Sequence, residues 1–249
     1  MIVNVNSQVD RPLRRRLDTA TRRGQIARAV LDAVHARGVR GLSVGAVARR
    51  VGIAPSAIYR HYPSKEAMLD AVVELVRERT LANLAAARAG SPDALGALED
   101  LLARHIRLIR ENQALPRLLF SEDFYAGRPA RRLNVLSVLL GFADGIAELI
   151  RLGQRRGEIR SELDPRTVAV MFVGLFQPAA FLWSLSEGGF DVSRQARDAW
   201  PLFRRAIGTE GGAGRRTPRA ARTSESRARS MARGRSAAHP SPAKPETRS

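Results

Sequence analysis

The sequence predicts an all-α protein in which a short three-helix unit at the N-terminal end is followed by a larger helical domain. Apolar residues recur at three- and four-residue intervals over most of the chain, as they do on the buried faces of helices. Ser, Gly and Pro stand where these periodic stretches begin or end, which are the positions that capping residues occupy. One long stretch, Arg132 to Arg156, carries two adjacent apolar stripes and therefore has to be covered from two sides.

The composition narrows the class of protein before any motif is considered. The chain has 249 residues, 44% of them hydrophobic, which suffices to bury a core. It has no cysteine, so disulfides, thiolate metal sites and cysteine nucleophiles are excluded. The first residues lack the apolar run of a secretory signal, so we expect a cytoplasmic protein.

The positive charge is concentrated at the two ends. The formal net charge is +18, and residues 1–65, 66–208 and 209–249 carry +10, +1 and +7. A near-neutral middle between basic ends favours a polyanionic partner that is met at the ends. The first 20 residues are polar and basic, and we expect a flexible arm there.

Two short helices are expected next. Apolar residues from Ile26 to Val34 follow helical spacing, and Gly38 is a candidate for the C-terminal cap. Ser43 stands at an N-cap position, and the apolar face that follows it ends at Gly52. A third helix begins at Ala54–Pro55, because a residue before proline adopts extended backbone and proline is tolerated at the first helical position.

The third helix has room for barely two turns before Pro63, and Ser64 then begins the next helix. A helix this short is stable only when neighbouring helices hold it. Two helices joined by a brief turn that contains glycine form the helix-turn-helix unit, which places its second helix in the major groove of DNA.

The run from Thr21 to Val76 resembles the N-terminal domain of the TetR family, the tetracycline-repressor-like bacterial transcription regulators. The resemblance lies in the order of features within "RGQIARAVLDAVHARGVRGLSVGAVARRVGIAPSAIYRHYPSKEAMLDAV": a first helix ending at Gly38, Gly52 at the turn, and the YRHY and SKE strings. It implies a DNA-binding domain over residues 21–76, a ligand-binding and dimerisation domain over 77–208, and a basic arm and tail over 1–20 and 209–249.

The resemblance also implies which residues contact DNA. Ser43, Tyr59, His61 and Lys65 match positions that contact the phosphate backbone. The positions that face the floor of the groove are Pro55, Ser56, Ala57 and Arg60. Only Arg60 among these has donors for a strong base contact. Tyr62, in contrast, is expected to pack between the third helix and the fourth.

No pattern in the sequence favours an enzyme. The four histidines are scattered, without a partner at metal-ligand spacing, and there is no phosphate-binding loop or nucleophile elbow. We therefore expect no catalytic residue, no metal and no cofactor. His105 falls within an apolar periodic stretch and is expected either to line a cavity or to be a satisfied core histidine.

The middle of the chain is expected to be helical throughout. One helix begins at Ser91-Pro92-Asp93, one covers Leu115 to Phe124, one covers Arg132 to Arg156, and a last one covers Ser193 to Ile207. The segment from Val168 to Leu185 reaches the lower length limit for a membrane span, but Gln177 and Pro178 interrupt it, so no membrane is expected.

The preferred interpretation pairs the Val168–Leu185 segment with the Arg132–Arg156 helix. Together they would form half of a four-helix bundle between two subunits, as the resemblance also implies. The residues expected at the dimer interface are Leu139, Phe142, Ile146, Phe172 and Phe181. The residues expected to line a ligand pocket are His105, Phe120, Phe124 and Phe176.

The sequence thus predicts a homodimeric regulator, expected to be a repressor, which leaves a palindromic double-stranded DNA operator when an unknown small-molecule effector binds. Two alternatives remain: an architectural protein that binds DNA without sequence preference, and a helical small-molecule-binding protein or enzyme with an incidental DNA module. Residues from Thr209 onward have few large apolar groups and are expected to be disordered.

Overall fold

The structure, a computed structural model, describes residues 10–209, and the side chains from Thr19 onward. Its elements in this range are all helices, apart from one isolated antiparallel bridge between Ile159 and Gly208. The prediction of an all-α protein is therefore confirmed. The predicted tail lies outside the described residues, except for Thr209.

The N-terminal unit consists of α1 (Asp10–Arg37), α2 (Val44–Val51) and α3 (Pro55–Tyr59). The prediction of a flexible arm over residues 1–20 is wrong from Asp10 onward, because α1 begins there. Arginine and leucine favour a helix, and Pro12 falls in the first turn, where proline is tolerated. Residues 1–9 lie outside the described part of the chain.

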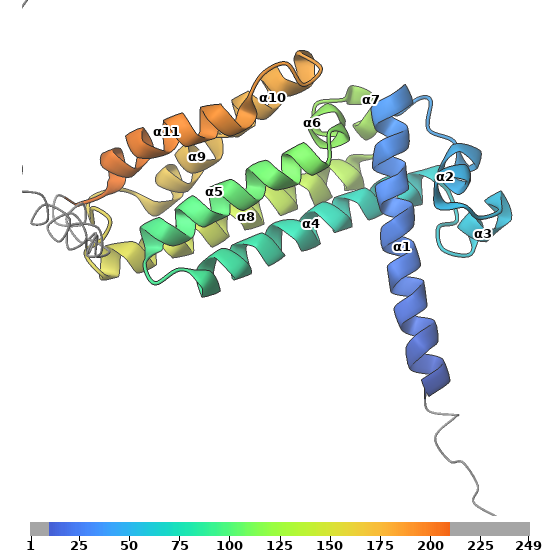
Figure 1. The fold of residues 1–249 in the computed structure, drawn as a ribbon, viewed down its shortest axis with the longest axis horizontal. Helices are drawn as coiled ribbons and strands as arrows, with labels where there is room; N and C mark the ends of the chain where they lie inside the picture. The colour runs from blue at the N-terminus through green and yellow to red at the C-terminus, as the bar shows by residue number, and fades with distance from the viewer. Residues whose placement is uncertain (1–9, 210–249) are drawn as a thin grey trace, which may run out of the picture. The chain divides into compact units, whose positions relative to one another are not determined.

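Helix α4 (Lys65–Gly90) follows and crosses the expected domain boundary at residues 76–77 without a break. Figure 1 shows α1 across one end of α4, with α2 and α3 on the far side of α1. The buried side of α1 contacts both α2 and α4. Helix α4 is therefore in direct contact with the unit that contains α3.

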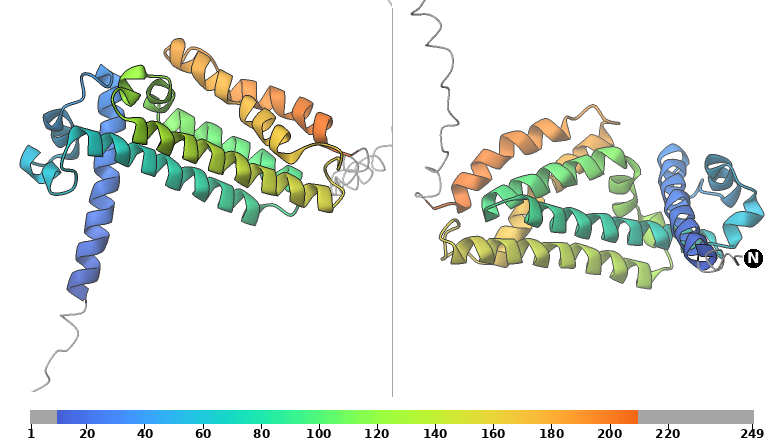
Figure 2. Two further views of the ribbon diagram at one scale, coloured as in Figure 1. Left: turned by 180° about the vertical axis from the view of Figure 1, so that it is seen from behind. Right: turned by 60° about the horizontal axis from the view of Figure 1, so that its bottom comes forward.

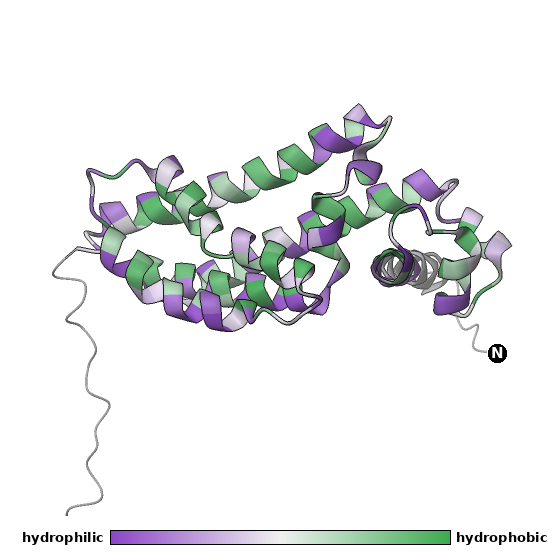
Figure 3. Ribbon diagram, turned by 90° about the horizontal axis from the view of Figure 1, so that it is seen from above, coloured by the Kyte–Doolittle hydropathy of each residue, from purple (hydrophilic) through white to green (hydrophobic). Residues whose placement is uncertain are grey.

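The remaining helices are α5 (Ala94–Glu111), α6 (Ala114–Leu119), α7 (Glu122–Tyr125), α8 (Pro129–Arg155), α9 (Pro165–Gly174), α10 (Gln177–Leu185) and α11 (Val192–Ile207). Helices α4, α5 and α8 lie side by side, and α9 packs on α8 while α11 packs on α5 (Figure 2). Hydrophobic and hydrophilic residues alternate in bands along these helices, as expected of amphipathic helices (Figure 3).

Two expected helices are interrupted in the structure. The stretch from Leu115 to Phe124 is two short helices, α6 and α7, separated at Phe120–Ser121. The apolar stretch from Val168 to Leu185 is also two helices, α9 and α10, which meet just before Pro178 because a proline inside a helix cannot donate the backbone hydrogen bond.

Pro129–Arg155 and Pro165–Leu185 are long and apolar enough to cross a bilayer by length and composition. The second of these is not one continuous helix. Both stretches bury one side in the hydrophobic core of the subunit. Buried core helices are often as long and as apolar as these two stretches.

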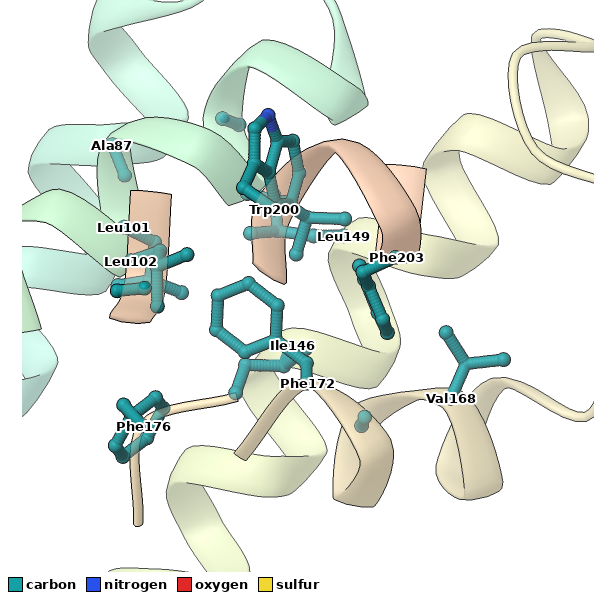
Figure 4. Packing of buried hydrophobic residues seen from close by; sticks show 14 of the residues in the cluster. Ala87, Leu101, Leu102, Ile146, Leu149, Val168, Phe172, Phe176, Trp200 and Phe203 are labelled. Atoms are coloured by element: carbon teal, nitrogen blue, oxygen red, sulfur yellow. The ribbon is translucent and has the colours of Figure 1, made fainter. Parts of the chain in front are cut away.

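Two hydrophobic clusters hold the described residues together. One joins α5, α8, α9, α10 and α11, and Trp200, Phe203, Phe172 and Ile146 lie at its centre (Figure 4). The other joins the N-terminal unit and α4 to residues of α6, α7 and α8, among them Leu118, Phe124 and Val135. The N-terminal unit therefore shares its core with later helices instead of enclosing one of its own.

Candidate nucleic-acid interface and interior cavity

Helix α2 begins at the residue that the sequence predicts. Ser43 has extended backbone (φ −135°, ψ 151°), and its Oγ accepts a hydrogen bond from the Ala46 backbone N–H at 3.2 Å. The side chain is exposed, and the first turn of α2 contains no acidic residue. The Ser43 hydroxyl can therefore still donate to a phosphate at this positive helix end.

The turn between α2 and α3 depends on Gly52. Its φ of +73° lies in the left-handed region, which side chains with a Cβ rarely adopt. The Gly52 N–H points back to carbonyl groups of α2, and the Ile53 N–H donates to the Ala48 carbonyl at 3.0 Å. These bonds end α2 and fix the direction in which α3 leaves.

Helix α3 is held by one side and exposed on the other. Ala54 has the extended backbone expected before proline, with φ −66° and ψ 145°, and makes no side-chain cap. Ile58 is fully buried against the core of the N-terminal unit. The exposed side chains are Pro55, Ser56, Tyr59 and Arg60, while Ala57 and His61 are half-buried. The structure thus brings the predicted contact residues of this helix together on one surface.

Two further residues of this region are bound within the protein. Tyr62 is buried, donates its hydroxyl to the Arg23 carbonyl at 3.3 Å, and lies 5.0 Å from the Arg23 guanidinium. Tyr62 is therefore buried, as a packing role requires, and the polar contacts that hold it come from α1. Lys65 is half-buried, and its Nζ donates to the Arg40 carbonyl at 3.4 Å, which leaves its other hydrogens free for a phosphate.

A residue that the sequence analysis missed connects this surface to α8. Arg131 is 5% exposed, and its guanidinium donates to Asp70 Oδ1 at 2.6 Å, to the Phe124 carbonyl at 2.8 Å and to the Glu66 carbonyl at 3.0 Å. It also lies 5.1 Å from the Phe124 ring. Arg131 shares its helical face with Val135, and this spacing was the signal in the sequence that it would be buried.

An apolar cavity of about 310 Å³ lies among the helices that follow α3. It takes residues from α4, α5, α6, α8, α9 and α10, together with Phe176. Its polar side chains are His105, Thr80 and Gln177. The other lining residues are Val76, Leu108, Ile109, Leu115, Pro116, Leu119, Val138, Leu139, Leu140, Phe142, Ala143, Val170, Val173 and Ala180.

His105 lies between two aromatic rings of this cavity. Its ring stacks on Phe142 at a centroid distance of 5.0 Å and is tilted against Phe176 at 4.2 Å. Its Nδ1 is buried and has no hydrogen-bond partner within the described part of the chain. Burial lowers the pKa of His105 to about 4, because the surrounding apolar groups penalise the charged imidazolium.

The structure divides the four residues that were expected to line a pocket. His105 and Phe176 line the cavity, Phe124 lines a smaller pocket that shares Val76, Leu115, Leu119, Val138 and Leu139 with it, and Phe120 lines neither. Phe120 is 51% exposed and makes an edge contact with Phe181 at 5.1 Å, whereas Phe124 is buried beneath Arg131. Phe120 lies at the interruption between α6 and α7, outside both helices, which fits its exposure.

The residues expected at a dimer interface are also divided. Phe142, Ile146 and Phe172 lie in the core of the subunit, so their assignment to an interface is wrong. Leu139 and Phe181 are 44% and 41% exposed. The two stripes expected from the sequence do not coincide with the buried and exposed sides of α8. Leu139, expected in one stripe with Phe142 and Ile146, is exposed, whereas Ile150, expected in the other stripe with Leu140, is buried.

The exposed stripe forms part of a larger apolar face on α8, α9 and α10, which we call the apolar face. Its large side chains are each more than two-fifths exposed in the single subunit. They are Leu133, Leu136, Leu139, Leu140, Val170, Met171, Phe181, Leu182 and Leu185. Leu139, Leu140 and Val170 also line the cavity, so the cavity lies directly beneath this face.

Comparisons with known proteins bear on the surface of α3 and on the cavity. Residues 27–72 match the model of the bacterial regulatory proteins of the tetR family, and residues 76–206 match the YsiA-like protein C-terminal region. The chain is 24% identical over 213 residues to the nucleoid occlusion factor SlmA of Haemophilus influenzae, covering 81% of this chain and 95% of that protein.

Two further similarities concern proteins whose names refer to a ligand. The chain is 26% identical over 170 residues to the A-factor receptor protein of Streptomyces griseus, covering 66% of this chain and 55% of that protein. The fold is also similar to the transcriptional regulator FadR from Bacillus subtilis in complex with stearoyl-CoA, with a TM-score of 0.61, 19% identity, and coverage of 72% and 96% of the two chains.

Proposed function

The chain belongs to the TetR family of bacterial regulatory proteins and is a DNA-binding regulator, and we propose that it is a homodimeric repressor that a small molecule releases from a palindromic operator. The observation that carries the proposal is the surface of α3. Ile58 fixes this helix from behind, while Ser56, Tyr59 and Arg60 are exposed on its other side.

The contacts follow from what each side chain can donate. Arg60 is the one long donor among the four residues that we assign to the groove, and a guanidinium can bind guanine O6 and N7 together. Ser43, Tyr59, His61 and Lys65 would bind phosphates and so set the register of the protein on the duplex. The net charge of +10 over residues 1–65 strengthens all of these contacts.

Two subunits are proposed because the apolar face is larger than a subunit in water would leave uncovered. It includes Leu133 at 66% exposure and Leu140 at 56%. A two-fold pair would cover these side chains and present two α3 helices to two half-sites. This symmetry is why the proposed operator is palindromic.

The cavity is the proposed effector site. Helix α4 lines it through Val76 and Thr80 and also directly follows α3, so a ligand that prefers one position of α4 would change the spacing of the two α3 helices. The names of two similar proteins, a receptor and a regulator solved with stearoyl-CoA, support a ligand-responsive role. We place this activity in the cytoplasm, with residues 21–76 as the DNA-binding domain and residues 77–208 as the ligand and dimerisation domain.

A second candidate is a protein that binds DNA with little sequence preference. Ala57 offers only a methyl group and Ala54 has no capping hydroxyl, so direct readout from α3 rests mainly on Arg60. The similarity to a nucleoid occlusion factor also fits a role other than control of a single promoter. The number and distribution of binding sites separate the two candidates.

The test is a selection of binding sites from random duplexes with purified full-length protein, followed by titration of the selected duplex and a scrambled one at several salt concentrations. A repressor should select one palindrome and prefer it by at least about 10³-fold. A preference below tenfold, or a selected motif without two-fold symmetry, would contradict the proposal and favour the second candidate.

A further inference from the structure

The wall of the cavity restricts the chemistry of the ligand, and this inference rests on the proposed function of the cavity as the effector site. Three lining side chains are polar, namely His105, Thr80 and Gln177, and none of the lining residues is Lys, Arg, Asp or Glu. The helices that enclose the cavity therefore provide hydrogen-bonding groups but no charge to pair with an ionised ligand.

His105 is the polar side chain best placed for a ligand. Phe142 and Phe176 hold its ring from two sides at centroid distances of 5.0 and 4.2 Å. Within the described residues the imidazole makes no hydrogen bond, and its Nδ1 is buried without a partner. Burial of a polar group without a hydrogen-bond partner is unfavourable, and a ligand that forms the missing hydrogen bond would remove this cost. A neutral imidazole has one donor and one acceptor nitrogen, so either kind of neutral group would suit it.

The charge state of His105 adds to this restriction. Because burial lowers its pKa to about 4, the imidazole is neutral at physiological pH and offers a carboxylate a hydrogen bond but no positive charge. An ionised group that entered this cavity would lose its hydration without gaining a counter-ion, which is far more costly than burial of a hydroxyl that forms a hydrogen bond.

The cavity borders the apolar face. Leu139, Leu140 and Val170 line the cavity and are also exposed on the apolar face. An ionised head group that extended from the cavity past these residues would meet apolar side chains. In the proposed dimer it would lie in the covered interface, where water is excluded.

We propose that the effector is an uncharged, mainly apolar molecule that carries a neutral hydrogen-bonding group against the imidazole of His105. The cavity volume of about 310 Å³ holds about ten non-hydrogen atoms, if each takes about the 30 Å³ that a water molecule occupies in the liquid. Medium-chain alcohols have this size and chemistry, and the carboxylates of equal length differ from them in charge.

The experiment measures binding of straight-chain 1-alkanols of eight to fourteen carbons, the carboxylates of the same lengths, and decanoyl-CoA to full-length protein at pH 7.5. His105→Phe keeps the aromatic stack but removes both nitrogens, and His35→Phe makes the same exchange at an exposed position of α1 outside the cavity. Ala143→Leu reduces the cavity volume from α8 and so identifies the site of binding.

We expect at least one alkanol to bind at least about tenfold more tightly than the carboxylate of the same length and than decanoyl-CoA. His105→Phe should weaken that alkanol about fivefold, as expected for one lost hydrogen bond. His35→Phe should change nothing, and Ala143→Leu should weaken alkanols and carboxylates together. Thermal unfolding of each variant verifies that it is folded.

The proposal is overturned if no alkanol binds saturably, if a carboxylate or decanoyl-CoA binds as tightly as the alkanol, or if folded His105→Phe binds the alkanol like the unchanged protein. Release of operator DNA is measured separately. An alkanol that binds through His105 but leaves the DNA complex intact contradicts the effector role and not the ligand chemistry. Release by a charged ligand from the same cavity contradicts the ligand chemistry and not the effector role.

Discussion

At the scale of single residues, surroundings determine what a side chain can do. Arg60 caps the C-terminal end of α3, is exposed, and has its donors free for DNA. Arg131 carries the same group but is buried, and all of its polar contacts are with the protein itself. We therefore assign Arg60 to DNA recognition and Arg131 to stability because of where each lies, since both are the same type of residue.

We expect Arg60→Ala to relax the preference at one or two operator positions and to cost about 1–3 kcal/mol there, because a guanidinium that contacts guanine discriminates among bases. Tyr59→Phe is the comparison, since loss of a phosphate contact should weaken all duplexes alike. Titrations against single-position operator variants measure both effects. Uniform weakening by Arg60→Ala would assign Arg60 to the phosphates instead.

His105 gives a prediction about stability and pH. Its pKa is lowered to about 4 in the folded protein from about 6.5, so the unfolded chain binds the proton more readily and stability falls as the pH drops from 6.5 toward 4. The contribution of this group is up to about 3 kcal/mol, at about 1.4 kcal/mol per pKa unit. Urea unfolding at pH 7.5 and 5 should show a smaller loss for His105→Phe than for the unchanged protein. Equal losses would mean that His105 is not buried as the structure has it.

At the scale of elements, the contacts that hold α4 decide where α3 is presented. Five residues separate the end of α3 from the start of α4. Arg131 of α8 binds both Glu66 and Asp70, which lie in the first two turns of α4. Asn134, one turn further along α8, accepts from Arg77 and donates to Glu74 at 3.0 Å. These polar contacts bind α8, which lines the cavity, to the helix that follows α3.

We expect Arg131→Leu to lower the free energy of unfolding by about 2–4 kcal/mol, because it leaves the Phe124 and Glu66 carbonyls without their donor. Arg132→Leu, on the next residue of α8, is the matched control: Arg132 is exposed, has a ring contact with Tyr125 at 5.6 Å, and its loss should cost less than about 1 kcal/mol. Denaturant titration compares the two. Equal effects of the two substitutions would show that the buried contacts of Arg131 add nothing to stability.

At the scale of the whole molecule, the apolar face gathers nine large exposed apolar side chains on α8, α9 and α10. It lies over the cavity, with which it shares Leu139, Leu140 and Val170. Association through this face would therefore bring the proposed interface and the proposed effector site into direct contact.

We expect the protein to be a dimer without DNA and to sediment as one species near twice 27.3 kDa. Leu140→Glu should produce monomers at micromolar concentration, because a carboxylate would be buried in the interface. Leu202→Glu introduces the same charge at a leucine that is 67% exposed on α11, which is not one of the three helices that carry the apolar face, and should leave the dimer intact. A Leu140→Glu protein that stays dimeric would place the interface elsewhere.

Local chemistry allowed the sequence by itself to determine where several helices begin and where α2 ends. Ser43, Ser64, Asp93 and Asp164 each accept a backbone N–H three residues later, and Gly52 ends α2 with a positive φ. Such caps depend only on residues within one turn, so they can be read from the chain. The exposed side of α3 was also predictable, because Ile58 is the large apolar residue of a helix too short to bury two sides.

Tertiary structure alone decided which residues of the two apolar stripes face inward. A sequence pattern does not distinguish Leu139 from Phe142 and Ile146, because all three are large and apolar. In the fold, α5 and α9 cover Phe142 and Ile146 and leave Leu139 exposed. The same holds for Arg131, which is buried because Asp70 and two carbonyls from distant segments meet it. Burial depends on which helix lies opposite, and that partner is set by contacts between residues far apart in the chain.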